Sequence, residues 1–204
     1  MKFVPFPQFS KPAEEYFDIA QELAKASGES FARKYGKDTI LTEDYLAKIL
    51  QASGRTDVKG LRVLDLGCGS IRSSDYNGTY VAMKHRLYEP WLCRLLHHLG
   101  AHAIGIDRDI QDEEFEHHKI DLLETCISDV VKEPVDIISA FALFDSPTLN
   151  HGVLNAGRQL FGLLNIQFDS ILKEDGAFVF NPEGTGYSGE FKEIPKAQAP
   201  FIIS

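Results

Sequence analysis

Hydrophobic residues in this chain occur in two alternating patterns. Nearly continuous apolar runs are typical of strands buried on both faces of a sheet, and they occur at 61–66, 101–106, 135–143 and 177–181. A less regular run at 118–123 predicts one more short strand. Apolar residues at helical spacing predict helices between these runs, at 89–100, 122–131 and 155–172. Strands that alternate with helices indicate parallel βαβ units, so we expect an α/β fold: a Rossmann-like, mostly parallel twisted sheet with helices on both faces.

The segment that precedes the first of these strands has helical patterns. Ser10, followed by a proline and two acidic residues, is typical of a helix start. A second helical piece is expected from about Ser30, and a third from Thr42 to Gly54. We therefore expect two parts, a helical cap at 1–55 over the carboxyl edge of the sheet and a Rossmann-like core at 56–204.

Both ends of the chain are predicted to be less regular. Prolines at positions 5 and 7 exclude a helix from residues 1–10, which are expected to lie extended.

The helix at 155–172 is predicted to bury six residues: Leu160, Leu163, Leu164, Ile166, Phe168 and Ile171. A turn at Lys173–Gly176 then leads to the strand at 177–181. One weak strand is expected near 201–203, so a C-terminal hairpin would be shortened.

The stretch Leu61–Ser70 is the most informative part of the sequence. An apolar strand that carries an acid at Asp65 ends in two glycines, Gly67 and Gly69, with one residue between them. Because glycine has no Cβ, a turn of this kind lets the backbone approach a ligand closely. Ligands of parallel sheets bind beyond the carboxyl ends of the strands, which is where this turn and the predicted strand end at Asp107 lie.

A dinucleotide site of the G-x-G-x-x-G kind requires a third glycine, which permits close packing of the following helix. Arg72 stands at that position, and no helix is predicted directly after it. A nicotinamide-dependent oxidoreductase is therefore a weaker alternative than a protein whose cofactor lacks a pyrophosphate.

The order of the motifs resembles the class I S-adenosylmethionine-dependent methyltransferases. Residues 63–70, Val-Leu-Asp-Leu-Gly-Cys-Gly-Ser, closely match the first motif of that family. Its next two acidic positions are matched by Ile-Gly-Ile-Asp, which ends at Asp107, and by Asp121-Leu122. Its fourth motif resembles residues 136–141, and the stretch before its fifth strand resembles residues 172–179. The resemblance covers about residues 60–181.

The resemblance implies S-adenosyl-L-methionine as cofactor and S-adenosyl-L-homocysteine as product. Asp107 would hold the ribose hydroxyls, and Asp121 with Leu122 would meet the adenine. The cofactor-binding residues that it implies are Asp65, Gly67, Cys68, Gly69, Asp107, Arg108, Asp121, Leu122, Ala140 and Phe141. The acceptor would be a small molecule or a protein.

Several of these residues also have purely structural interpretations. The two glycines can mark a tight turn alone, and Asp107 and Asp121 can cap the helices that follow strands. Cys68 is expected to be a small buried residue and not a nucleophile. His85 and His151 are the weak candidates for a catalytic base, since both lie in predicted loops near the mouth of the site. The adjacent histidine pairs at 97–98 and 117–118 are expected at the surface, and no metal site is predicted.

Two departures from the family pattern leave an alternative open. Ile71–Leu87 is a polar span where a helix would follow the glycine turn directly, so it is expected to form a lid or a substrate loop. The predicted C-terminal hairpin is short. A degenerate member that binds the cofactor, or a partner protein, without catalysis would account for both.

Composition limits the class of protein further. A formal charge of −9 over 204 residues argues against nucleic acid and anionic membrane as partners. Three widely spaced cysteines form neither a CxxC motif nor a zinc pattern, which favours reduced thiols. With no apolar run near the ~20 residues of a spanning helix and no signal peptide, a cytoplasmic protein is expected; its oligomeric state is not indicated.

Overall fold

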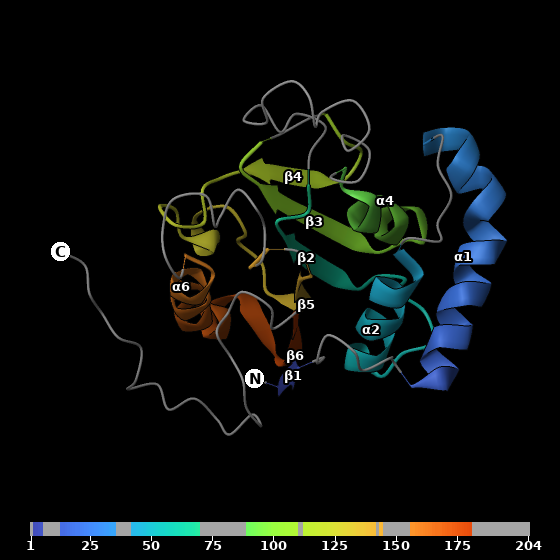
Figure 1. Cartoon of the computed structure of the whole chain (residues 1–204), viewed down its shortest axis with the longest axis horizontal. Coiled ribbons are helices and arrows are strands. Elements are labelled where there is room, and N and C mark those ends of the chain that lie inside the picture. Colours follow the sequence, from blue (N-terminus) through green and yellow to red (C-terminus); the bar gives the residue numbers. More distant parts are fainter. Residues whose placement is uncertain are drawn as a thin grey trace.

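Six parallel strands form the centre of the molecule in this computed structural model (Figure 1). The structure describes residues 2–5, 13–35, 42–69, 89–109, 112–141, 143–144 and 156–180, with the backbone alone at 2–5, 156 and 158. The strands are β1 (Lys2–Pro5), β2 (Arg62–Leu66), β3 (His102–Asp107), β4 (Glu116–Lys119), β5 (Val135–Ala140) and β6 (Leu172–Phe180). Each neighbouring pair is parallel, in the order β1-β6-β5-β2-β3-β4. The predicted α/β, Rossmann-like arrangement is confirmed.

This strand order has a switch point at the centre of the sheet. From β2 the chain proceeds outward through β3 to β4, and it then returns to β5 on the other side of β2 and proceeds to β6. The connections that leave the carboxyl ends of β2 and β5 therefore diverge. In an open parallel sheet this divergence creates the crevice where ligands bind.

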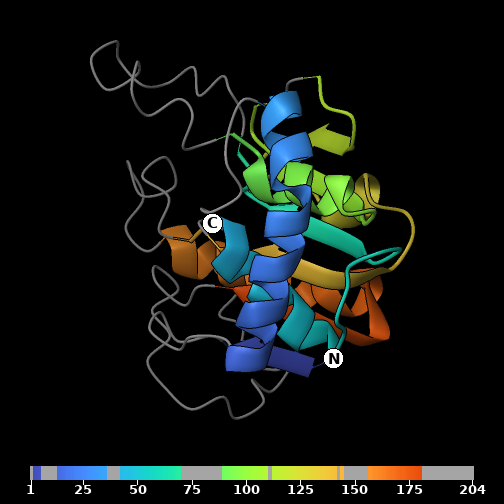
Figure 2. The ribbon, with the colours of Figure 1, turned by 90° about the vertical axis from the view of Figure 1, so that its right-hand side faces the viewer.

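Helices cover both faces of the sheet (Figures 1 and 2). On one face lie α2 (Glu43–Ser53) and α4 (Trp91–His98), and the long helix α1 (Glu14–Tyr35) packs against both from outside. On the opposite face lie α6 (Ala156–Ile171) and the short 3-10 helix η3 (Ile127–Asp129). Within the described part of the chain, no helix is both long and apolar enough to cross a membrane.

Each face has its own hydrophobic cluster, because side chains alternate along every strand. Val63 of β2 and Ile137 of β5 pack under α2 and α4, together with Leu50 and Leu96 of these helices. The following residues, Leu64 and Ile138, belong to the cluster under α6.

The N-terminal helices differ from the prediction in continuity. Residues 14–35 form one helix and not two pieces, since Gly28 continues the helix and a Cβ at that position would meet nothing within 4 Å. Buried Ala24 and Phe31 hold the two halves of α1 against the same surface. The helix predicted at 42–54 is confirmed as α2, and Gly54 ends it with a left-handed φ of 66°.

The region around β4 differs from the prediction in one strand and one helix. The third predicted strand lies at 116–119 and not at 118–123. The helix predicted at 122–131 is wrong: Asp121 closes a turn by accepting the amide of Leu123 on its side chain and the amides of the next two residues on its carbonyl. Only the short η3 follows it.

The last two strands also differ in extent. β5 ends at Ala140, three residues before the predicted end. The predicted turn at Lys173–Gly176 is instead part of β6, which begins directly after α6 and has an irregular register opposite Val135–Ile137. The predicted helix at 155–172 is confirmed with bounds of 156–171, but Leu163 and Ile166 are 38% and 53% exposed and not buried.

The outer edge of β6 is paired with β1, so the expected extended N-terminus is in part a strand. A C-terminal hairpin would therefore have to pair elsewhere in the sheet. Residues 181–204, including the weak strand predicted at 201–203, lie outside the described residues. The cap over the carboxyl edge, the shortened hairpin and the division at residue 55 stay predictions.

Candidate cofactor site at the carboxyl edge

The glycine turn lies directly beyond β2, at the switch point. Gly67 and Gly69 have φ angles of 69° and 95°, a conformation that other residues rarely adopt. The amides of Gly67 and Cys68 both donate to the carbonyl of Ile106 on β3, at 2.8 and 3.1 Å. A Cβ on Gly67 would lie 3.0 Å from Leu143 Cδ1, beyond the end of β5. The turn is therefore bonded to β3 and lies close to Leu143, so a larger residue at Gly67 would adopt an unfavourable φ and would require Leu143 to shift.

Asp107, at the end of β3, is joined to this turn. Its Oδ2 accepts the amide of Gly69 at 3.0 Å, and its Oδ1 accepts the amide of Asp109 at 3.2 Å. Burial raises the pKa of the Asp107 carboxyl above its ordinary value, and the two amides oppose that shift. Each carboxylate oxygen keeps a further lone pair for a donor such as a hydroxyl group.

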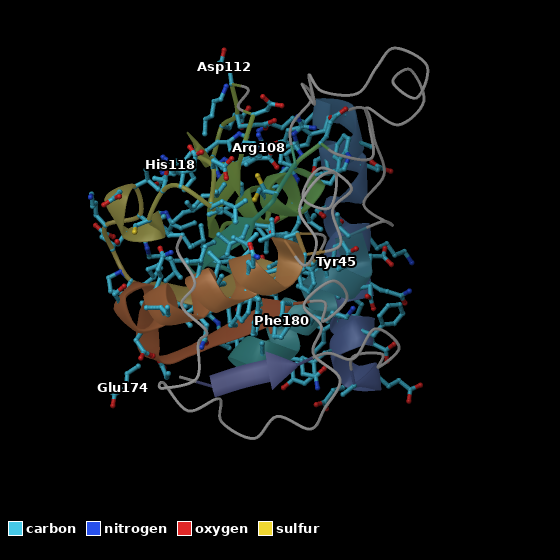
Figure 3. The ribbon with its side chains drawn as sticks, turned by 60° about the vertical axis from the view of Figure 1, so that its left-hand side comes forward. Tyr45, Arg108, Asp112, His118, Glu174 and Phe180 are labelled. Carbon is cyan, nitrogen blue, oxygen red and sulfur yellow. The ribbon has the colours of Figure 1, made fainter. Side chains whose placement is uncertain are left out.

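Asp121, after β4, has a local structural role. Its Oδ1 accepts the amide of Leu123 at 3.0 Å, and its Oδ2 lies 3.3 Å from Nε of Arg108. Leu122 is buried in the cluster under α6. The structure thus brings Arg108 and Asp121 together beside Asp107, and Arg108 projects at the upper end of the sheet (Figure 3). The structural interpretation of Asp121, that it closes a turn, is seen directly.

On the other side of the switch point, an aromatic residue after β5 stacks on one from α2. Phe141 comes directly after Ala140, and its ring stacks on that of Tyr45 from α2, with centroids 4.4 Å apart and an interplanar angle of 7°. Nζ of Lys48 lies 5.7 and 5.8 Å from the two ring centroids. In Figure 3 Tyr45 lies beyond Phe180, the last residue of β6, whereas Glu174 projects from the other end of that strand. Nothing in the pattern around Tyr45 distinguishes it from a core residue of an amphipathic helix, so sequence analysis missed it.

Asp65 lies inside the sheet and not at its exposed edge. Its side chain is buried between β5 and α4, where Oδ1 accepts a 2.7 Å hydrogen bond from the Ser139 hydroxyl and Oδ2 lies 3.9 Å from Cys93 Sγ. Burial raises the pKa of the Asp65 carboxyl to about 7; the hydrogen bond from Ser139 lowers it and the Asp107 carboxyl raises it. The Asp65 side chain therefore joins β2 to β5 and to α4.

Cys68 points back into the protein. Its sulfur lies 3.5 Å from His117 Nε2 on β4, and it would lie 2.8 Å from a Cβ on Gly105. Cys68 and His117 meet across β3 because Gly105 has no side chain. Burial raises the pKa of the Cys68 thiol well above its ordinary value. Cys68 is buried, as predicted, and His117 is partly exposed.

A buried ionic cluster lies at α4, and sequence analysis also missed it. Arg94 of α4 is 6% exposed, and its guanidinium binds both carboxylate oxygens of Glu113 and one of Glu89. Its Cζ lies 4.7 Å from the ring centroid of Trp91 and 5.3 Å from that of Tyr35. The sequence gives no sign of this cluster, because Glu89 and Glu113 come from different segments and meet Arg94 only in the folded chain.

The candidate catalytic residues His85 and His151 and the predicted lid 71–87 all lie outside the described residues. Among the residues that are described, no group of three or more His, Cys, Asp and Glu side chains is arranged to hold a metal ion.

The acceptor at this edge, the Asp107 carboxylate, fits the hydroxyl groups of a nucleoside better than a phosphate. A carboxylate held by backbone amides suits a cis-diol, which donates two hydrogen bonds. Of the described groups near it, Arg108 is paired with Asp121, and His117 of β4 acts on the Asp107 carboxyl. The sequence matches no model of a known protein family, and a search of curated proteins gives no match either. Geometry and sequence motifs therefore carry the functional argument.

Proposed function

We propose that this protein binds S-adenosyl-L-methionine at the carboxyl edge of its sheet and transfers the methyl group to a small-molecule or protein acceptor. The observation that carries the proposal is the Asp107 carboxylate, which accepts the Gly69 amide beside a positive-φ glycine turn at the switch point. The agreement of residues 63–70 with the first motif of class I methyltransferases supports the same cofactor.

Each described residue has a separate task in this proposal. Asp107 accepts the two ribose hydroxyls with its remaining lone pairs. Gly67 and Gly69 expose backbone to the amino acid end of the cofactor, and Phe141, backed by Tyr45, forms an apolar wall on the β5 side. When bound, the cofactor supplies an electrophilic methyl group on a sulfonium. The chain itself mainly has to align the acceptor and exclude water, so a catalytic dyad is not required.

The binding step can be tested by calorimetry with S-adenosyl-L-homocysteine and, separately, with NAD. We expect the first ligand to bind and Asp107→Ala to abolish its binding, because the ribose acceptor is removed. Asp112→Ala is the matched control: Asp112 is exposed, lies five residues further along the chain and projects away from the sheet (Figure 3). Binding of NAD alone, or of neither ligand, would overturn the proposal.

The transfer step needs a separate measurement. Protein that binds the cofactor is incubated with methyl-labelled cofactor and a panel of small-molecule and protein acceptors. Transfer that is lost in Asp107→Ala supports the enzyme. Binding without transfer across the whole panel would support the alternative, a degenerate member that binds cofactor or a partner without catalysis.

A further inference from the structure

Two of the three cysteines lie side by side beneath the glycine turn. Asp65 of β2 and Gly105 of β3 are paired in register, so they are neighbours on the same face of the sheet. Cys93 Sγ, from α4, lies 3.9 Å from the Asp65 carboxylate, and Cys68 Sγ fills the space above Gly105. Strands in a sheet are about 4.8 Å apart, so the two sulfur atoms occupy adjacent positions over this pair. Each thiol also affects the pKa of the other through a direct side-chain interaction.

We propose that Cys68 and Cys93 form an oxidation site, in which hydrogen peroxide closes a disulfide that ties the glycine turn to α4. One thiolate attacks the peroxide, its O–O bond breaks, and a sulfenic acid and one water form. The second thiol then displaces the hydroxyl group as a second water. In total, two thiols and one hydrogen peroxide give one disulfide and two waters, with both sulfur atoms oxidised and the peroxide reduced.

The surroundings determine how this pair reacts. Both thiols are buried, which favours a small neutral oxidant over a bulky one such as oxidised glutathione. Burial raises the pKa of both thiols, so the thiolate is scarce at neutral pH and the reaction is expected to accelerate as pH rises. Cys68 stands between two glycines, so neither of its neighbours in the chain has a side chain that would have to be displaced.

Closure of this bond would act on the edge of the sheet above it. The Gly69 amide that contacts Asp107 directly follows Cys68. Pulling the Cys68 sulfur toward α4 moves that amide, and with it the turn on which a cofactor would rest. We therefore expect the oxidised protein to lose cofactor binding, a consequence that depends on the proposed function, whereas formation of the bond does not.

The third cysteine provides the background for the test. Cys126 is exposed and precedes η3, on the opposite face of the sheet. It is replaced in Cys126→Ser, which removes cross-links between molecules. This variant is treated with hydrogen peroxide between pH 7 and pH 9 and digested with trypsin without reduction. We expect a linked pair of peptides, 63–72 and 87–94, two hydrogens lighter than their sum. Dithiothreitol should separate them.

Cys68→Ala and Cys93→Ala in the same background should give no linked pair, with far-ultraviolet circular dichroism as the check of folding. The inference is overturned if the two peptides carry separate sulfinic acids, or if both thiols stay unmodified under conditions that oxidise Cys126 in the unaltered chain. A linked pair in a protein that binds S-adenosyl-L-homocysteine equally well before and after oxidation would overturn the coupling to the site. A linked pair in a protein that never binds this ligand would count against the proposed function alone.

Discussion

The two faces of the sheet are built from the same strands but carry different chemistry. Under α6 the described core is apolar and rich in ring contacts: the tilted rings of Phe168 and Phe178 have centroids 4.3 Å apart, and the stacked rings of Phe178 and Phe180 have centroids 4.7 Å apart. Under α2 and α4, the core also contains Asp65, Ser139 and the guanidinium of Arg94. The face under α6 thus contributes apolar packing, whereas the face under α2 and α4 combines apolar packing with buried polar side chains.

The polar groups are concentrated because register places them in one row. His117, Gly105, Asp65 and Ser139 occupy paired positions on β4, β3, β2 and β5. A slip of one residue in any strand would move its member of this row to the apolar face under α6. The position of the glycine turn is therefore a property of the sheet and not of the turn alone.

The largest expected effect tests the apolar face. Phe168→Ala removes a fully buried ring between α6 and β6 and leaves a cavity, so the free energy of unfolding should fall by about 3–5 kcal/mol. Urea denaturation measures this fall. Phe168→Leu keeps most of the volume and should lose clearly less. An equal loss from both variants would show that this face does not depend on close packing.

Removing the charge on the polar face should cost slightly less. Arg94→Met leaves Glu89 and Glu113 buried together without a cation, and a loss of about 3 kcal/mol is expected. Lys34→Met is the matched control, because the Lys34–Glu114 pair is exposed and should contribute clearly less. Similar values for the two variants, by urea denaturation, would mean that burial of Arg94 is unimportant.

The pH dependence of stability should come from the same polar face. Because burial raises the pKa of Asp65 to about 7 in the folded protein, the unfolded chain releases this proton at lower pH. The contribution is fully present below the unfolded pKa of about 4 and is lost as pH rises toward 7. Between pH 5 and pH 7, we expect a loss of roughly 2 kcal/mol relative to Asp65→Asn.

Urea denaturation of both proteins across that range measures the difference in slope. The substitution removes the titrating group but keeps an acceptor for Ser139. Parallel curves for the two proteins would show that Asp65 stays ionised in the folded state at pH 5.

The smallest effect is expected at the exposed surface of α6. Ile166 is 53% exposed, so Ile166→Gln should change the free energy of unfolding by no more than about 0.5 kcal/mol. A loss as large as that of Phe168→Ala, in the same urea measurement, would indicate that this surface is covered in solution.

Local features of the sequence were sufficient for much of the fold. The continuous apolar run at 61–66 predicted β2, and the pattern from Pro90 to Gly100 predicted α4, because a few adjacent residues are enough to favour a buried strand or a helix. The positions of Gly67 and Gly69 beyond β2, and of Asp107 at the end of β3, followed from the same boundaries, and the structure brings the three together.

Where prediction failed, the apolar pattern did not report the feature that decided the outcome. Apolar spacing at 122–131 favoured a helix, but the Asp121 side chain and carbonyl close a turn there. Leu163 and Ile166 fit the helical period of α6, yet the buried surface of that helix is narrower than the apolar stripe in its sequence.

By itself, then, the sequence determined the central strands β2, β3 and β5, where the glycine turn lies and which acids stand at the end of β3 and after β4. Only the tertiary structure decided the partners: Tyr45 for Phe141, Ser139 for Asp65, His117 and Cys93 for Cys68, and two glutamates for Arg94. Backbone preferences and hydrophobic periods act over about ten residues, so they can be recognised in one stretch of chain. Partners drawn from different strands and helices are fixed by sheet register and helix packing, and these depend on the whole chain at once.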